Sequence, residues 1–253
     1  MNSPHSRLVV VVGAVLALAV AAVAAEPPII TKARAYLGPE PALNAVKGVH
    51  FSGKLVIVDS ANPQPTEPAT VEIHFRAPDQ QLIQATTSKL VETTGLDGYD
   101  AWQRQRDGAD PSKWQMKLLS ADQIKRLRAN TWESLGFFRG IESHGGRIED
   151  QGAVTVDGIA CQKLAYIYAP NIIFYRYIEV GSGRLRSTET ETGTKISEQG
   201  EIVSGGIKFP KSIVTVSPVG PGRTQTITLT FDKVVVNEPV PPKFFAVPAL
   251  PVK

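Results

Sequence analysis

Histidine and cysteine side chains supply many catalytic bases, nucleophiles and transition-metal ligands in proteins, and this sequence spaces them in no pattern typical of such sites. Cys161 is the only cysteine and stands in an alternating run, far along the chain from any histidine. That setting is typical of a packed thiol. His50, His74 and His144 lack metal-ligand spacing, and the first two are expected on the faces of strands. The sequence predicts neither a nucleophile nor a metal site.

Four aspartates gather in a short stretch and suggest calcium ligands: Asp97, Asp100, Asp107 and Asp110. Their spacing departs from the calcium-loop pattern, and two of them form Asp-Gly pairs that are typical of hairpin turns. The run His144-Gly145-Gly146 has no G-x-S-x-G elbow to complete a hydrolase site, so it is interpreted as a turn. We expect no catalytic residue, no cofactor and no enzyme activity.

The charge balance favours no class of charged partner. The sequence holds 27 Lys and Arg against 24 Asp and Glu, a formal net charge of +3. The run Lys125-Arg126-Leu127-Arg128 is too short for a nucleic-acid patch and is explained by the solvation of a helix. Binding to nucleic acid or to an anionic surface is therefore not expected.

The first 25 residues resemble a secretory signal peptide. Arg7 precedes an apolar run from Leu8 to Val20, and small residues near Ala24 and Ala25 offer two overlapping cleavage sites. The alternative is an uncleaved membrane anchor, because the apolar run continues to Ala25 and approaches the ~18 residues of a spanning helix. The alanine-rich run and its cleavage sites favour removal of residues 1–25. We expect the remainder, residues 26–253, to be a single domain in the periplasm.

Aromatic residues are spread along the chain in a manner that would suit an apolar pocket, which needs large side chains from several elements. Ordinary core packing explains most of them taken singly. The set comprises Phe51, Phe75, Trp102, Trp132, Tyr175, Tyr177 and Phe231.

Alternating patterns predict the strands that would position these side chains. Strands are expected from Val49 to Val58 and from Val71 to Arg76, followed by a series of further strand-like runs. Those runs are 82–87, 89–94, 101–106, 159–168, 173–180, 184–191, 195–203, 207–216 and 224–236. Asp-Gly and Gly-Gly pairs between them are the turn residues of antiparallel neighbours. A large antiparallel sheet or partial barrel is predicted.

One side of each long strand is more apolar than the other and is expected to face away from water. Either parity could face in, but Glu72, His74 and Arg76 alternate with the apolar set of the second strand, and threonines alternate with that of the last. The candidate cavity residues are Phe51, Leu55, Ile57, Val71, Ile73, Phe75, Ile227, Leu229 and Phe231.

Three helices are expected beside the sheet. The first contains Ile30, Ala33 and Leu37 on one face and stops at Gly38-Pro39, and the second starts at Pro41. The third opens at Ser120 with a capping box to Gln123 and runs to about Leu135. It either covers one end of the sheet, with Arg128 extending to water, or closes as a lid with Trp132 over an apolar cavity.

The order of these features resembles the outer-membrane lipoprotein-sorting family of LolA-like carriers, from about Tyr36 to Pro248. The resembling segments include Phe75-Arg76-Ala77-Pro78-Asp79, Leu96-Asp97-Gly98-Tyr99-Asp100-Ala101-Trp102 and Asp157-Gly158-Ile159-Ala160-Cys161. Phe174-Tyr175-Arg176-Tyr177-Ile178-Glu179, Asp232-Lys233-Val234-Val235-Val236-Asn237 and Phe244-Phe245-Ala246-Val247-Pro248 complete the series.

The resemblance implies a mainly β fold, in which a curved antiparallel sheet forms an incomplete barrel capped by helices. It further implies a carrier of lipid or of lipoprotein acyl chains, with membrane-bound donor and acceptor proteins. The gating arginine of the family immediately precedes a proline, whereas Arg76 is separated from Pro78 by Ala77. The alternative function is a regulatory or structural interaction module, with the same fold and a cavity filled by its own side chains.

Overall fold

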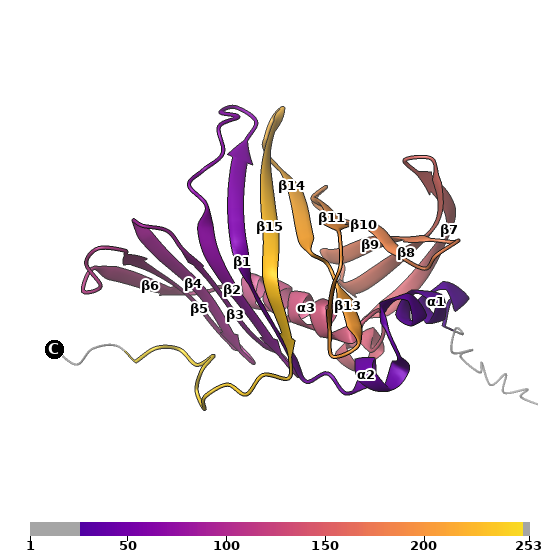
Figure 1. Ribbon diagram of the computed structural model, residues 1–253, viewed down its shortest axis with the longest axis horizontal. Coiled ribbons are helices and arrows are strands. Elements are labelled where there is room, and N and C mark those ends of the chain that lie inside the picture. The colour runs from indigo at the N-terminus through magenta and orange to yellow at the C-terminus, as the bar shows by residue number, and fades with distance from the viewer. Residues whose placement is uncertain (1–25, 250–253) are drawn as a thin grey trace, which may run out of the picture.

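The computed structural model describes residues 26–249, which fold into one large antiparallel sheet with helices on its concave face (Figure 1). The predicted signal peptide lies outside the described residues. The sheet has 13 strands in the order β6-β5-β4-β3-β2-β1-β15-β14-β11-β10-β9-β8-β7, and its two end strands do not pair with each other. The predicted mainly β, incomplete barrel is confirmed.

The strands follow one another mostly as hairpins. Their bounds are β1 Gly48–Asp59, β2 Ala69–Arg76, β3 Gln80–Thr86, β4 Leu90–Asp97, β5 Asp100–Asp107, β6 Trp114–Leu118, β7 Arg147–Val156, β8 Ile159–Ala169, β9 Ile172–Glu179, β10 Leu185–Thr190, β11 Lys195–Gln199, β14 Ser212–Gly220 and β15 Arg223–Val236, with β12 Ile202–Ser204 and β13 Ile207–Phe209 forming a separate hairpin.

The long strands β1 and β15 join the two wings of the sheet. Their pairing is antiparallel, with a bulge between Ser52 and Gly53. A Cβ atom at Gly53 would lie 2.1 Å from the carbonyl oxygen of Thr230. Only glycine therefore allows the two backbones to approach this closely, and bulges of this kind increase the local twist of a sheet.

Several predicted strand boundaries were wrong. The two end strands, β6 and β7, were not predicted, because most of their side chains are exposed and their patterns lack a clear apolar alternation. The predicted run 195–203 is interrupted at Gly200, where φ is 63°, and the run 207–216 is interrupted at Pro210. Each of these runs instead supplies one strand to the large sheet and one to the small hairpin.

The three predicted helices are present as α1 (Pro28–Leu37), α2 (Glu40–Asn44) and α3 (Ala121–Gly136), with a 3-10 turn at Ile141–His144. The predicted capping box is formed: the Gln123 backbone N–H donates to the Ser120 hydroxyl, and the Ser120 N–H donates to the Gln123 side chain at 3.0 Å. None of the helices within residues 26–249 has the length and hydropathy of a membrane-spanning segment.

The buried Arg34 of α1 ties the helices together. Its guanidinium donates to the carbonyl oxygen of Phe137 at 2.8 Å and pairs with Glu40 at 2.7 Å. The last carbonyls of a helix have no partner within the helix, so Arg34 satisfies the end of α3. This contact fixes α1 and α2 against α3.

Candidate ligand-binding site

The concave face of the sheet carries two clusters of buried apolar side chains. The first lies on β1, β2 and β15 and includes Phe51, Val71, Ile73 and Phe231. Phe137, at the end of α3, packs into it. The second lies on β8 and β9 and packs against α1 and α3. The half of the concave face that carries these two clusters is therefore filled by the protein's own side chains.

Farther along the same strands, the inward residues are only half-buried. Leu55 lies opposite Leu229, and Ile57 lies opposite Ile227. On the next strand, Ile213 also lies opposite Leu229. We call these five residues, Leu55, Ile57, Ile213, Ile227 and Leu229, the apolar strip. It lies on the long strands β1, β15 and β14, which extend beyond α3 in Figure 1.

The structure thus brings the sequence-predicted residues of the first, second and last strands onto one face. Phe51, Val71, Ile73 and Phe231 are core residues, and Phe75 is partly buried beside them. Leu55, Ile57 and Leu229 belong to the apolar strip. Ile57, Leu229 and their neighbours are half-buried, so part of their apolar surface stays exposed.

Trp132 does not belong to this group. It lies on α3 beside the second cluster, where its ring stacks on His144 at a centroid distance of 3.9 Å and on Tyr168 at 5.7 Å. The α3 side chains that reach the first cluster are instead Leu135 and Phe137. The sequence did not reveal these aromatic contacts, because His144 lies on a separate 3-10 turn that no helical periodicity relates to Trp132.

Other members of the predicted aromatic set face outward. Trp102 lies on the opposite side of the sheet from Phe51, and its indole donates to the carbonyl oxygen of Phe245 at 3.2 Å. Tyr175 and Tyr177 alternate with the inward Phe174 and lie near Lys163. The expectation that the whole set converges on one space was therefore wrong. Neighbouring residues of a strand point to opposite faces, so a difference of one position moves a side chain to the other side of the sheet.

Ion pairs join α3 to both wings of the sheet. Arg128 pairs with Asp79, in the β2–β3 turn, at 2.9 Å. On the other wing, Glu133 pairs with the buried Arg176 of β9, and Arg126 pairs with Glu191. The expectation that Arg128 extends to water was wrong: its side chain is 18% exposed, and its guanidinium lies 4.0 Å from the ring centroid of Tyr99.

Two titratable groups with shifted pKa values lie on the β9–β11 wing. Burial lowers the pKa of Arg176 to about 10, because desolvation disfavours the charged guanidinium. Burial also raises the pKa of Glu198, against the opposing effect of Arg176 and Arg184. Glu198 lies opposite Ile213 in the β11–β14 pairing. At its β14 edge, the apolar strip therefore meets the partly buried side chain of Glu198.

Arg76 is exposed at the end of β2 and alternates with Phe75, so it belongs to the outer face. Cys161 is buried and unpaired by any disulfide, and burial raises the pKa of its thiol. Asp107 and Asp110 accept hydrogen bonds from turn N–H groups and from Ser112. These contacts are those of an ordinary hairpin turn.

No protein-family model and no curated protein matches the sequence. Solved structures do resemble the fold. A LolA superfamily protein from Nitrosomonas europaea aligns with a TM-score of 0.55 and 11% identity, covering 87% of this chain and 96% of that one. An outer membrane lipoprotein-sorting protein domain from Vibrio parahaemolyticus aligns at 0.53 and 7% identity, covering 86% and 94%.

A DUF1329 family protein from Desulfovibrio piger aligns with a TM-score of 0.52 and 10% identity, covering 86% of this chain and 95% of that one. These alignments span nearly the whole length of each neighbour. The open 13-stranded sheet and its helices on the concave face are therefore a LolA-like fold.

Proposed function

We propose that this protein is a non-catalytic binder or carrier of a hydrophobic ligand, such as a lipid or the acyl chains of a lipoprotein. The observation that carries the proposal is the apolar strip: five aliphatic residues from three adjacent strands face one another on the concave side and are only half-buried. Contiguous exposed apolar surface on a folded protein commonly marks a site that a ligand or a partner covers.

The energy available from such a surface is sufficient for useful affinity. Each methylene that leaves water contributes roughly 0.8 kcal/mol. A chain that buries about 16 methylenes gains roughly 13 kcal/mol, of which association consumes at least about 4 kcal/mol. At this lower bound of the association cost, about 9 kcal/mol remains, which is more than the ~8 kcal/mol that corresponds to micromolar binding.

We also propose that the protein acts in the periplasm, with residues 1–25 removed on secretion. Arg7, the apolar run after it and the small residues near Ala24 support this location. The LolA-like fold is consistent with it. In a carrier role, membrane-bound proteins would deliver the ligand and accept it.

A regulatory or structural interaction module is the second candidate, and the filled half of the concave face favours it. Phe137 and the side chains of α2 occupy space beside Phe51 that a larger ligand would need. In this role, a partner protein would bind the outer face or a free sheet edge, such as β6 or β7.

Titration with a fluorescent fatty-acid analogue separates the two functions. We expect saturable binding to the wild type, and at least about tenfold weaker binding to Leu229→Glu and to Ile227→Glu. Each substitution would place an uncompensated charge against the acyl chain of the ligand. Thr228→Glu is the matched control, since it carries the same charge on the same strand but faces outward. Circular dichroism would establish that each variant is folded.

The carrier function is contradicted if the wild type does not bind, or if folded Leu229→Glu and Ile227→Glu bind as tightly as Thr228→Glu. Binding to a partner protein by wild type in the absence of any lipid binding would instead support the interaction module.

A further inference from the structure

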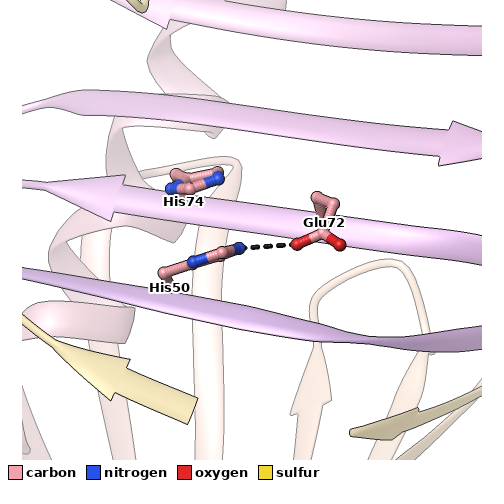
Figure 2. Close-up of side chains that lie close together, drawn as sticks. All are labelled: His50, Glu72 and His74. Carbon is pink, nitrogen blue, oxygen red and sulfur yellow. Dashed lines mark hydrogen bonds and ion pairs between the residues drawn. The ribbon is translucent and has the colours of Figure 1, made fainter. Parts of the chain in front are cut away.

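The outer face of the sheet brings together side chains that are separated in sequence. His50 on β1 lies directly opposite His74 on β2, and Glu72 shares the face of His74 two residues earlier. Figure 2 shows the three side chains on adjacent strands, with His50 directed toward Glu72. Glu238, which follows β15, reaches the other side of the His50 ring. The sequence interval of 24 residues between the histidines concealed this cross-strand pair.

The potential ligand atoms lie close to one another. One nitrogen of each histidine and one oxygen of Glu72 are all within 4.8 Å of one another. His50 Nε2 lies 2.6 Å from Glu72 Oε2, and the two imidazole rings stack at a centroid distance of 3.7 Å. Tetrahedral coordination at about 2.0–2.1 Å places ligand atoms roughly 3.4 Å apart. The separations therefore allow one ion to be shared, once one imidazole rotates out of the stack so that the in-plane lone pairs of both rings point to the same position.

The contacts of His50 already orient its ring for metal binding. A carboxylate lies at each ring nitrogen: Glu238 at Nδ1 and Glu72 at Nε2. Metal-binding histidines commonly donate the second ring N–H to a carboxylate, which fixes the tautomer. With Glu238 accepting from Nδ1, the Nε2 atom of His50 is left to face Glu72 and an ion that the two share.

We propose that His50 Nε2, Glu72 and His74 form a binding site for a divalent transition-metal ion of the zinc type, with Glu238 as the carboxylate that positions His50. Two imidazoles and a carboxylate are ligands that zinc prefers, and they leave a fourth position for water. The two glutamates balance the charge of the dication. None of these residues belongs to the apolar strip, so this site is independent of the hydrophobic ligand.

Solvent can reach the site. The side chain of His50 is 16% exposed and that of Glu72 is 37% exposed. A cavity of about 450 Å³, lined in part by His50, His74 and Glu238, opens beside the cluster.

The site would also fix the C-terminal segment. Glu238 begins the stretch that crosses the outer face, where the ring of Phe244 packs at 4.8 Å from His74 and Phe245 accepts from Trp102. A metal ion that orders His50 and Glu238 together therefore joins this segment to β1 and β2.

Calorimetric titration of Zn²⁺ into tag-free, chelator-treated protein tests the proposal. We expect one ion per chain with micromolar or tighter affinity, and Co²⁺ should give visible absorption bands on binding. His50→Gln and His74→Gln should each bind at least about tenfold more weakly. Glu238→Gln should retain one site of reduced affinity, because Glu238 orients a ligand and does not bind the ion.

His144→Gln is the matched control, since His144 is an exposed residue that stacks on Trp132, away from β1 and β2, and should not contribute. The proposal is overturned if the wild type binds no zinc, or if folded His50→Gln and His74→Gln both keep wild-type affinity. It is equally overturned if His144→Gln loses the affinity to the same extent as they do. Because fatty-acid binding is measured separately, failure here leaves the carrier function unaffected.

Discussion

Arg128 connects the helix on the concave face to one wing of the sheet. Its partner, Asp79, is also largely buried, with a side-chain exposure of 14%. Pairs shielded in this way are less screened than surface pairs, and removing one partner leaves the other charge without compensation. The contact therefore contributes to the position of α3 relative to β2 and β3.

A double-mutant cycle of Arg128→Ala and Asp79→Ala measures this contribution. We expect a coupling free energy of about 1–3 kcal/mol in chemical unfolding, typical of directly interacting partners. The cycle of Lys125 and Asp122 on the same helix is the control, because both side chains are more than half exposed and should couple by less than about 0.5 kcal/mol. Equal coupling in the two cycles would show that the Arg128 pair does not anchor α3.

Single residues were the hardest features to predict from the sequence. Arg128 interrupts the apolar arc of its helix, and nothing in that arc indicates that Asp79 lies within reach. His50 and His74 were correctly expected on strand faces, but their proximity depends on the exact register of β1 with β2. Register follows from the turn and the packing of both strands, so spacing along the chain does not reveal it.

At the scale of elements, the start of α3 was predicted well because a capping box is a local signal. The Ser120 hydroxyl accepts from the Gln123 backbone N–H, and the Gln123 side chain accepts from the Ser120 N–H. The capping box therefore forms without any tertiary contact. The strands β6 and β7 lacked such a signal. Their positions at the ends of the sheet leave most side chains in water, so these strands do not need an apolar alternation.

Ser120→Ala should lower the free energy of unfolding by about 1 kcal/mol, because the Gln123 N–H loses its acceptor. Thermal or urea unfolding would measure the change. Ser134→Ala is the control on the same helix: its hydroxyl donates to the carbonyl of Asn130 within the helix, and alanine is the better helix former. If Ser120→Ala is as stable as Ser134→Ala, the capping box does not contribute to the stability of α3.

At the scale of the whole molecule, the sequence predicted the class of fold and the inward parity of the long strands. The alternation of Val71 and Ile73 with Glu72 was sufficient, since a single buried face requires it. The division of that face into a filled half and a half-buried apolar strip could not be predicted. It depends on how far α3 extends along β1 and β15, which is a property of three-dimensional packing.

The location of the ligand is the central claim, and photocrosslinking tests it most directly. A fatty acid that carries a photoreactive group would be bound to the wild-type protein, irradiated and mapped by peptide mass spectrometry. We predict saturable crosslinks within the strands that form the apolar strip, at residues 53–57, 213–215 and 225–231. Crosslinks confined to the outer face around Trp102 and Phe245, or labelling that does not saturate, would contradict the account.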